Sequence, residues 1–250
     1  VHGLDIIVEH TVYQRLFVPC LQSADSIIAN SEHTRTLALG AGIANYRIRV
    51  LHPGVEFPPP DAHGFRAYLG IGPERPLLLS VGRIVARKGL PAFIEHTLVP
   101  LTRRYPELIF AVVGEEPRSA LVATDSEFQR VRDTITRCRM ERHVMLCGRL
   151  DDNALQAAYR EADALLFPVL DTPGDVEGFG MVAVEAAAHG LPTFAFRVGG
   201  VPNAILDGVT GELAPAGNYN VLTAKLAEYI ASAFKRQYAA QCLIHACANS

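Results

Sequence analysis

The segment Glu177-Gly178-Phe179-Gly180-Met181-Val182-Ala183-Val184-Glu185 carries the strongest structural signal in the chain. Apolar residues precede Glu185 and alanines follow it at 186–188, so apolar positions fall on every side of a 3.6-residue period. This pattern predicts a helix that is buried all round and begins at a glycine-rich turn. Because an unpaired buried carboxylate is costly, we expect Glu185 to pair with backbone donors, a cation or the hydroxyls of a ligand. The alternative is that it turns outward at the helix end or bonds to a neighbouring loop.

Outside this segment, short apolar runs alternate with helical patterns. The runs predict strands at 26–29, 77–81, 109–113, 144–147, 164–167 and 193–196, and the patterns between them predict helices at about 90–105, 152–161 and 180–189. Strands that are apolar throughout and separated by helices are typical of a parallel sheet with helices on both faces. The predicted fold class is therefore α/β, with a Rossmann-like parallel sheet.

A proline-dense stretch at 53–60 predicts a junction between two domains. Residues 1–56 hold too few elements for a complete domain: a strand end, a helix, the 26–29 strand, a second helix and a strand at 49–51. We expect them to be the C-terminal remnant of a first domain, and residues 57–250 to form the second, ending in one or two helices. Because the chain starts at Val1 rather than at methionine, we also expect it to begin inside a longer protein.

The 250 residues are 49% hydrophobic and 20% charged, which predicts a soluble globular protein and excludes a disordered or collagen-like chain. A net charge of −3 without a long Lys/Arg run argues against nucleic acid as a partner. No apolar run is long enough for an integral membrane segment, although peripheral membrane contact stays open. The five scattered cysteines predict free thiols and a cytoplasmic location. Without a Cys/His cluster, no metal is predicted.

Two of the predicted strand-to-helix turns carry groups that suit an anion. Gly82, Arg83 and Lys88 follow the 77–81 strand, and the turn at 177–180 follows the 164–167 strand. Ligands of open α/β sheets collect at the carboxyl ends of strands, and helix N-termini attract anions. We expect these cations and the amides at 179–182 to hold a diphosphate. The alternative is that Arg83 and Lys88 are solvated loop cations.

A diphosphate in this position would place Glu185 to accept hydrogen bonds from a ribose, which would solve its burial problem. Neither a G-x-G-x-x-G nor a P-loop lysine motif occurs, so a dinucleotide oxidoreductase and an NTPase have no positive support.

In the order and spacing of its motifs, the chain resembles the donor half of the retaining glycosyltransferases of GT-B fold, family 4, the group 1 type. The resemblance covers nearly the whole chain, and the motifs are specific together although each is weak alone. They are His2-Gly3-Leu4-Asp5, the 24–31 segment, Val50-Leu51-His52-Pro53-Gly54-Val55, Val81-Gly82-Arg83 with Lys88-Gly89, Val113-Gly114, Cys147-Gly148-Arg149-Leu150, the Glu177/Glu185 pair, and Gly199-Gly200-Val201-Pro202.

The resemblance implies a role for each predicted site residue. Arg83 and Lys88 would bind the donor diphosphate, Glu185 the ribose hydroxyls and Glu177 the transferred sugar. The acceptor-side histidine would be His2, at a strand end near the anomeric carbon, unless its position is an accident of the chain terminus. The remaining donor-binding positions would be Gly82, Gly178, Phe179, Gly180, Met181 and Val182 around the phosphates, with the backbone at Arg149 and Leu150 meeting the nucleobase.

The implied activity is transfer of a hexosyl unit from a UDP- or GDP-hexose to a hydroxyl of a sugar, lipid or small molecule, with retention and without cofactor or metal. The segment alone is expected to be inactive. A sugar-nucleotide epimerase or a phosphorylase of the same architecture, and a non-catalytic nucleotide-sugar-binding module, are the alternatives. Two departures from the family pattern are Gly114-Glu115-Glu116-Pro117, where Gly-x-Gly-Pro is common, and Asn203, where an acid is usual.

Overall fold

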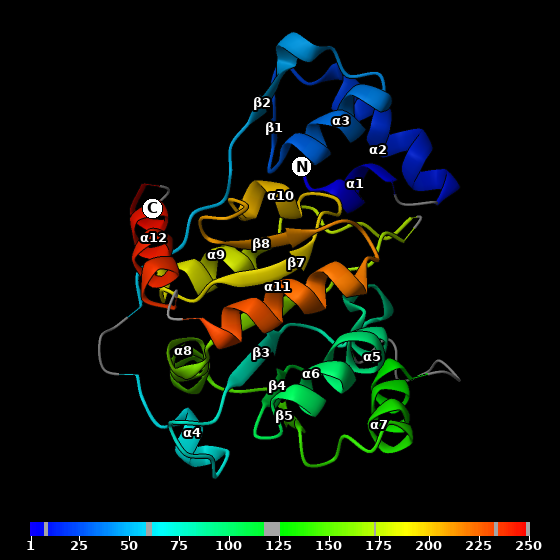
Figure 1. The fold of residues 1–250 in the computed structure, drawn as a ribbon. Helices are drawn as coiled ribbons and strands as arrows, with labels where there is room; N and C mark the ends of the chain where they lie inside the picture. The colour runs from blue at the N-terminus through cyan, green and yellow to red at the C-terminus, as the bar shows by residue number, and fades with distance from the viewer. Residues whose placement is uncertain (8–9, 59–61, 118–125, 173, 233–234, 249–250) are drawn as a thin grey trace.

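The largest element of the structure is a six-stranded parallel sheet (Figure 1). This computed structural model describes residues 1–250 except 8–9, 59–61, 118–125, 173, 233–234 and 249–250. The strands are β3 (Leu77–Val81), β4 (Ile109–Val113), β5 (Val144–Gly148), β6 (Ala164–Phe167), β7 (Thr193–Phe196) and β8 (Gly211–Ala214). Their spatial order is β5-β4-β3-β6-β7-β8. The chain therefore winds outward on both sides of a switch point between β3 and β6.

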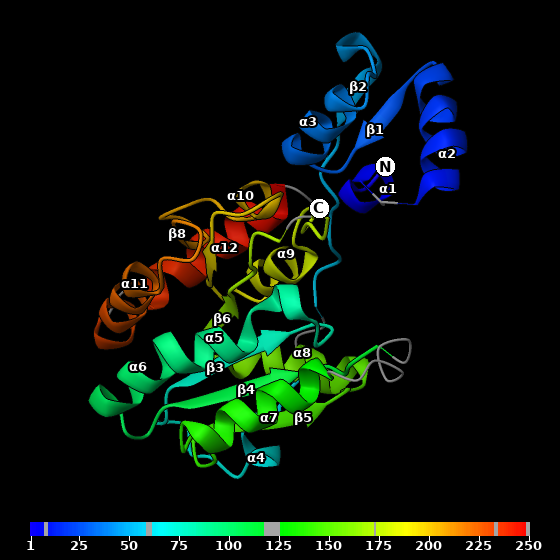
Figure 2. The same cartoon turned by 90° about the vertical axis from the view of Figure 1, so that its right-hand side faces the viewer.

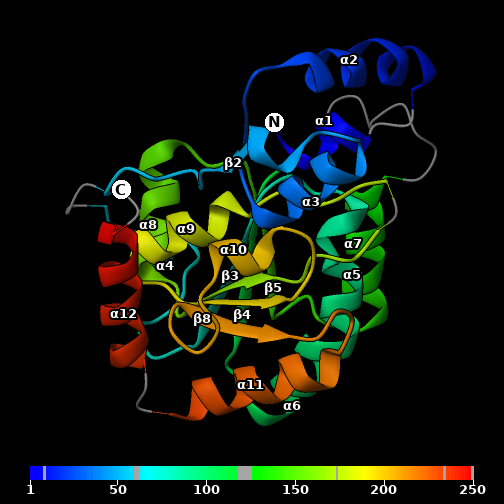
Figure 3. The same cartoon turned by 90° about the horizontal axis from the view of Figure 1, so that it is seen from above.

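Helices cover both faces of this sheet, as expected for strands that are apolar on both sides. Alternate strand residues point to opposite faces: Leu77 and Leu79 pack in one core and Leu78 in the other. The first core is completed by α4 (Phe65–Tyr68), α8 (Asp152–Glu161) and α9 (Met181–Ala188), and the second by α5 (Leu90–Phe93), α6 (Val99–Arg104), α7 (Glu127–Arg137) and α11 (Tyr219–Ala231). Figure 3 shows α8 and α9 on one side of the strands and α5 and α7 on the other.

Shorter elements complete this unit. A 3-10 turn at Ala86–Lys88 follows β3, and a π-helical turn at Ile94–Leu98 joins α5 to α6. The short helix α10 (Val201–Ala204) follows β7, and α12 (Lys235–Ala248) packs against α9. Within the described part of the chain, no helix has the length and apolar character needed to cross a membrane.

Residues 1–50 form a smaller unit above the large sheet (Figure 2). Its strands β1 (Ile27–Ala29) and β2 (Ile48–Val50) pair in parallel. Its other elements are α1 (Gly3–Ile7), α2 (Thr11–Ser23), α3 (Glu32–Gly40) and a 3-10 turn at Asn45–Arg47. A separate apolar cluster that includes Ile6, Ile27 and Ile48 forms its core. Between this unit and α4, the described residues hold no helix or strand, and Pro59 and Pro60 of the predicted junction lie outside the described residues.

The α/β fold expected from the sequence is confirmed, and the six strands predicted from apolar runs, together with the one predicted at 49–51, lie within one residue of their expected ends. The expectation of a strand end at His2 is wrong, because residues 3–7 form helix α1. Asp5 explains the difference: its carboxylate accepts a hydrogen bond from the backbone N–H of His2 at 2.8 Å and so satisfies a free donor where the helix begins.

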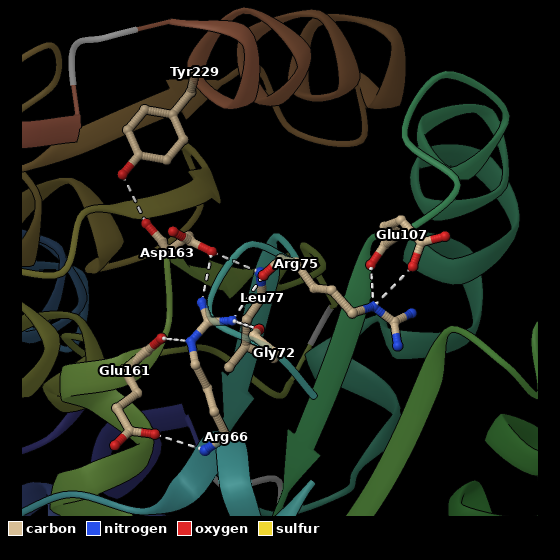
Figure 4. A network of polar contacts seen from close by, with 8 residues as sticks. All are labelled: Arg66, Gly72, Arg75, Leu77, Glu107, Glu161, Asp163 and Tyr229. Carbon is tan, nitrogen blue, oxygen red and sulfur yellow. Dashed lines mark hydrogen bonds and ion pairs between the residues drawn. The ribbon is translucent and has the colours of Figure 1, made fainter. Parts of the chain in front are cut away.

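A polar network fixes the amino end of β3, at the opposite edge of the sheet from the candidate site (Figure 4). The guanidinium of Arg66 donates to Asp163 at 3.1 Å and to the backbone oxygen of Glu161 at 3.0 Å. Asp163 also accepts the N–H of Leu77 at 2.7 Å, and its backbone oxygen accepts the hydroxyl of Tyr229 at 2.7 Å. These bonds connect α4, α8 and α11 to the first residue of β3. Each of these groups bonds to another residue of the large unit, and none of them lines the cavity described below. We therefore assign the network a structural role.

Candidate functional site

A cavity of about 500 Å³ lies where the switch point of the large sheet meets the small unit. Ligands of open α/β sheets bind at this point, outside the carboxyl ends of the strands. Its walls are Gly82, Arg83, Arg87 and Lys88 after β3, Phe167 and Val176–Val182 after β6, and His2, Gly3, Asn30 and Pro53 from the small unit and its connection. The cavity therefore brings together ten of the thirteen predicted site residues.

Glu177, Lys88 and Arg87 form a group of ion pairs in the cavity. Oε2 of Glu177 lies 2.8 Å from Nζ of Lys88 and 3.2 Å from Nη1 of Arg87. The Nε of Arg87 donates to Asp175 at 2.9 Å, and Nζ of Lys88 lies 4.4 Å from the ring centroid of Phe167. Burial lowers the pKa of Lys88, while the Glu177 carboxylate acts in the opposite direction.

Arg83 adds an exposed positive charge to this group. Among the described residues that line the cavity, the cations Arg83, Arg87 and Lys88 outnumber the one acid, Glu177. The walls of the cavity therefore carry an excess of positive charge, which favours an anionic ligand.

The loop after β3 is held against the loop after β6 at Gly89. This residue has φ +65°, and a Cβ atom there would lie 2.4 Å from the backbone oxygen of Pro168. The N–H of Leu170 donates to the backbone oxygen of Arg87 at 2.7 Å across the same contact. A glycine is required because both the close approach and the left-handed backbone disfavour a side chain. The contact brings Arg87 and Lys88 within reach of Glu177.

The glycine-rich turn before α9 rests on the loop after β7. The N–H of Gly200 donates to the backbone oxygen of Glu177 at 2.8 Å, and a Cβ atom at Gly200 would lie 2.0 Å from the backbone oxygen of Gly178. Gly180, with φ +104°, begins α9, whose first residues Met181 and Val182 line the cavity. The N-terminus of α9 thus faces the cavity with its unpaired N–H groups and its partial positive charge.

Glu185 lies in the second turn of α9 and does not line the cavity. It is half-buried, and its Oε2 atom accepts a hydrogen bond of 2.7 Å from the hydroxyl of Tyr159 on α8. Burial, aided by the Glu185 carboxylate, raises the pKa of Tyr159 well above its ordinary range, so this hydroxyl stays a donor. The buried helix and the need for a partner were predicted correctly, but the partner inside the protein is a tyrosine that the sequence did not indicate.

Arg149 and Leu150 also lie outside the cavity walls, at the carboxyl end of β5. They belong to the same edge of the sheet, because the N–H of Gly114 donates to the backbone oxygen of Gly148 at 2.8 Å and the N–H of Gly82 to that of Val113 at 3.0 Å. These bonds align the ends of β5, β4 and β3. Arg149 and Leu150 are thus two strands away from the cavity along one continuous edge.

His2 lies at the opposite wall, just before α1. Its Nδ1 atom is 2.9 Å from Nδ2 of Asn30, which directly follows β1. A Cβ atom at Gly178 would lie 3.3 Å from the same Nδ2 atom, so the absent side chain lets the turn approach Asn30. His2 and Glu177 therefore face one cavity from the two units.

A family model for group 1 glycosyl transferases matches residues 64–242, which is most of the chain. The chain belongs to the group 1 glycosyltransferases. Among the curated members of this family, a GDP-mannose-dependent alpha-(1-6)-phosphatidylinositol monomannoside mannosyltransferase of Mycolicibacterium smegmatis is 31% identical over 215 residues, covering 83% of this chain and 53% of the relative. D-inositol 3-phosphate glycosyltransferase 2 of Catenulispora acidiphila is 33% identical over 217 residues, covering 82% of this chain and 48% of the relative.

Solved structures show the same GT-B fold. Anabaena HepE, determined in complex with UDP and glucose, superposes with a TM-score of 0.81 at 23% identity, and the match covers 100% of this chain and 66% of HepE. A C-terminal domain of a group 1 family protein, LpcC of Francisella tularensis, gives a TM-score of 0.62 at 23% identity, covering 76% of this chain and 95% of its own. The chain spans about half the length of the two curated relatives, at 53% and 48%.

The sequence analysis assigned no role to two residues that line this cavity, Arg87 and Asn30. Arg87 was given no role in the sequence analysis, yet its buried side chain bridges Asp175 and Glu177. Asn30 was noted within a motif but given no role, and it contacts His2 directly. The sequence carried no signal that Arg87 would be buried, because arginine side chains are mostly exposed.

The two departures from the family pattern both have structural explanations. Glu116 accepts hydrogen bonds from the hydroxyl of Ser126 at 2.5 Å and the N–H of Glu127 at 2.7 Å, so its carboxylate occupies the N-terminus of α7. Asn203 accepts the N–H of Glu32 at 3.2 Å, which joins α10 to the start of α3. A carboxylate at position 203 would accept the same bond.

Proposed function

We propose that the protein containing this chain transfers a hexosyl unit from a UDP- or GDP-hexose to a hydroxyl acceptor with retention at the anomeric carbon, as a family 4 enzyme. The observation that carries the proposal is the cationic cavity at the switch point of the sheet, between Arg83, Lys88 and the N-terminus of α9. A diphosphate fits this combination because guanidinium, ammonium and free helix N–H groups all stabilise phosphate oxygens.

The edge of the sheet suggests how the rest of the donor lies. From the diphosphate, the nucleoside would extend away from the small unit, with its ribose toward Glu185 and its base toward Arg149 and Leu150. The hexose would extend the other way, toward Glu177 and His2. This direction uses every predicted site residue, including the three that lie outside the cavity.

In the proposed reaction the protein acts mainly through charge. As the bond between the anomeric carbon and the diphosphate breaks, negative charge grows on the leaving phosphate. Arg83, Lys88 and the first amides of α9 would stabilise that charge, and preorganised donors of this kind are usually the largest catalytic contribution. We propose that these groups take the place of a divalent ion, so that the reaction needs neither metal nor cofactor.

In the free site, Lys88 and Glu177 are paired with each other. A bound diphosphate would offer Lys88 a second anionic partner, and a sugar hydroxyl would offer Glu177 a donor. Arg87 would stay on Glu177, because it is also held by Asp175 at 2.9 Å. Glu177 would thus keep its orientation while it binds the sugar.

The names of two similar proteins suggest which nucleotide-sugar donors to consider. The mycolicibacterial relative is named as GDP-mannose-dependent, and HepE was solved with UDP and glucose. We further propose that residues 1–56 and 57–250 belong to two domains that close over the donor about the 53–60 connection. The described cysteines Cys20, Cys138, Cys147 and Cys242 are free thiols, which fits the proposed cytoplasmic location.

The test is a transfer assay with the full-length protein and UDP- and GDP-linked hexoses of α configuration. D-inositol 3-phosphate and phosphatidylinositol monomannoside, suggested by the names of the relatives, are the first acceptors to try. The proposal expects one donor to give a glycoside whose anomeric proton shows the α configuration by NMR. A product of β configuration would contradict retention, and epimerised nucleotide sugar without transfer would contradict the activity.

A further inference from the structure

A chain of hydrogen bonds in the small unit ends on the ring of His2. The backbone N–H of Thr34 donates to Oγ of Ser31 at 3.0 Å, and Oγ of Ser31 donates to Oγ1 of Thr34 at 3.1 Å. Oγ1 of Thr34 donates to Oδ1 of Asn30 at 2.7 Å, and Nδ2 of Asn30 lies 2.9 Å from Nδ1 of His2. Ser31 and Thr34 are 0% exposed and Asn30 is 8% exposed, so water does not compete for these bonds.

The direction of this chain follows from finding an acceptor for each buried hydroxyl hydrogen. Oγ of Ser31 accepts the backbone N–H of Thr34, and among its described contacts the acceptor for its own hydrogen is Oγ1 of Thr34. The hydroxyl of Thr34 then donates to Asn30, which identifies the amide atom facing Thr34 as oxygen. The amide atom that faces His2 is therefore the NH2 group, which has no lone pair to offer. Nδ1 of His2 must accept.

We infer that Asn30 is a positioning residue that holds His2 as the neutral tautomer with its proton on Nε2. In that tautomer the ring presents an N–H donor on its free side, and the ring lines the cavity. The ligand atom next to Nε2 is then an oxygen that accepts a hydrogen bond, as a sugar hydroxyl does. This consequence for the ligand depends on the proposed function, whereas the tautomer itself does not.

Packing at the cavity wall keeps the amide close to the histidine. Gly178, in the turn after Glu177, leaves only 3.3 Å between its hypothetical Cβ position and Nδ2 of Asn30. Gly3 is buried beside His2, and a Cβ atom there would lie 2.9 Å from a methyl of Val176. The two glycines allow the small unit to approach the turn, so that the Asn30 amide, the His2 ring and Glu177 meet around one cavity.

The direct test is the ring nitrogen NMR spectrum of the protein labelled with 15N-histidine, with His2 assigned by comparison with His2→Gln. We expect Nδ1 of His2 to show the shift of an unprotonated ring nitrogen and Nε2 that of an N–H nitrogen. In Asn30→Asp the carboxylate only accepts, so the proton should move to Nδ1. The matched control is Asn45→Asp, an exposed position in the same unit, which should leave the His2 spectrum unchanged.

A proton on Nδ1 in the wild-type protein would overturn the inference, and this reading needs no variant beyond the His2→Gln used for the assignment. Thr34→Val provides a second variant should Asn30→Asp fold poorly: it removes the donor to Oδ1 of Asn30, so the amide is free to turn and both tautomers should appear. If Thr34→Val still showed a single, unchanged tautomer of His2, that result would also contradict the role of this chain of hydrogen bonds.

Activity then tests the role of the tautomer separately. Asn30→Asp should lower turnover by about tenfold or more, the effect of one lost hydrogen bond, with little change in the KM for the donor. Full turnover in a variant whose proton has moved to Nδ1 would overturn the functional part of the inference. A wild-type protein that transfers no sugar would instead contradict the proposed function, while the NMR spectrum would still decide the tautomer.

Discussion

Lys88 and Glu177 form an ion pair with 2.8 Å between Nζ and Oε2, although they lie on loops that follow different strands. The pair exists because β3 and β6 are neighbours at the centre of the sheet. It places a mostly buried cation and the carboxylate of Glu177 in one contact, with Arg87 as a third member. Glu177 is therefore already paired in the free site, and a diphosphate would have to share Lys88 with it.

The lowered pKa of Lys88 predicts how nucleotide affinity depends on pH. The protonated ammonium attracts the diphosphate, and burial favours its neutral form, so the proton is lost at a lower pH than the ordinary lysine value of 10.5. Affinity for UDP or GDP should be full below the lowered pKa and should fall as the pH rises through it. Calorimetric titrations from about pH 7 to pH 10 measure this change.

In Lys88→Arg the fall should disappear, because a guanidinium keeps its proton over this range. Lys225→Arg, far from the cavity, is the control and should keep the wild-type profile. An identical fall in wild type and Lys88→Arg would exclude Lys88 as its origin.

Glu185 is predicted to recognise the ribose and not the phosphates. Glu185→Gln should weaken UDP or GDP binding by about tenfold, since a hydrogen bond from a hydroxyl to a charged acceptor is replaced by a weaker one. Binding of inorganic pyrophosphate, which has no ribose, should stay the same. Equal losses for nucleotide and pyrophosphate would show that the substitution disturbs α9 and not a ribose contact.

The network around Arg66 is predicted to support stability. Arg66→Met would leave Asp163 without its guanidinium, and we expect it to lower the free energy of unfolding by about 2 to 4 kcal/mol, as loss of one member of a mostly buried pair does. Arg75→Met breaks the pair with the exposed Glu107 and should cost less than about 1 kcal/mol. Urea unfolding of both variants gives the comparison, and similar losses would contradict the assigned role of Arg66.

The strands were predictable because a strand that is buried on both faces is apolar along its whole local sequence. A parallel strand such as β4 is apolar at every position, since both of its faces pack against helices. β8 was missed because Gly211 and Glu212 interrupt its apolar run and Glu212 serves a polar network with Lys225. Helix α1 was missed because five residues carry too little periodicity to distinguish a helix from a strand end.

The charged part of the site was predictable only in outline. The strand-to-helix turns identified Arg83, Lys88 and Glu177, because those positions follow from where strands end. The bonds between them depend on strand order, which places Lys88 beside a residue 89 positions further along the chain. Tyr159 was missed for the same reason: its contact with Glu185 joins two helices that pack side by side on one face of the sheet.

We propose that the cavity beside Arg83 binds the diphosphate of a nucleotide. The most direct measurement is isothermal titration of the protein with UDP, GDP and ADP, repeated with Arg83→Ala and with Arg132→Ala, an exposed arginine on α7 away from the cavity walls. We predict that one nucleotide binds at a single site, that Arg83→Ala weakens it by about tenfold or more, and that Arg132→Ala does not. Absence of binding by all three nucleotides, or equal affinity in wild type and Arg83→Ala, would contradict a diphosphate site beside Arg83.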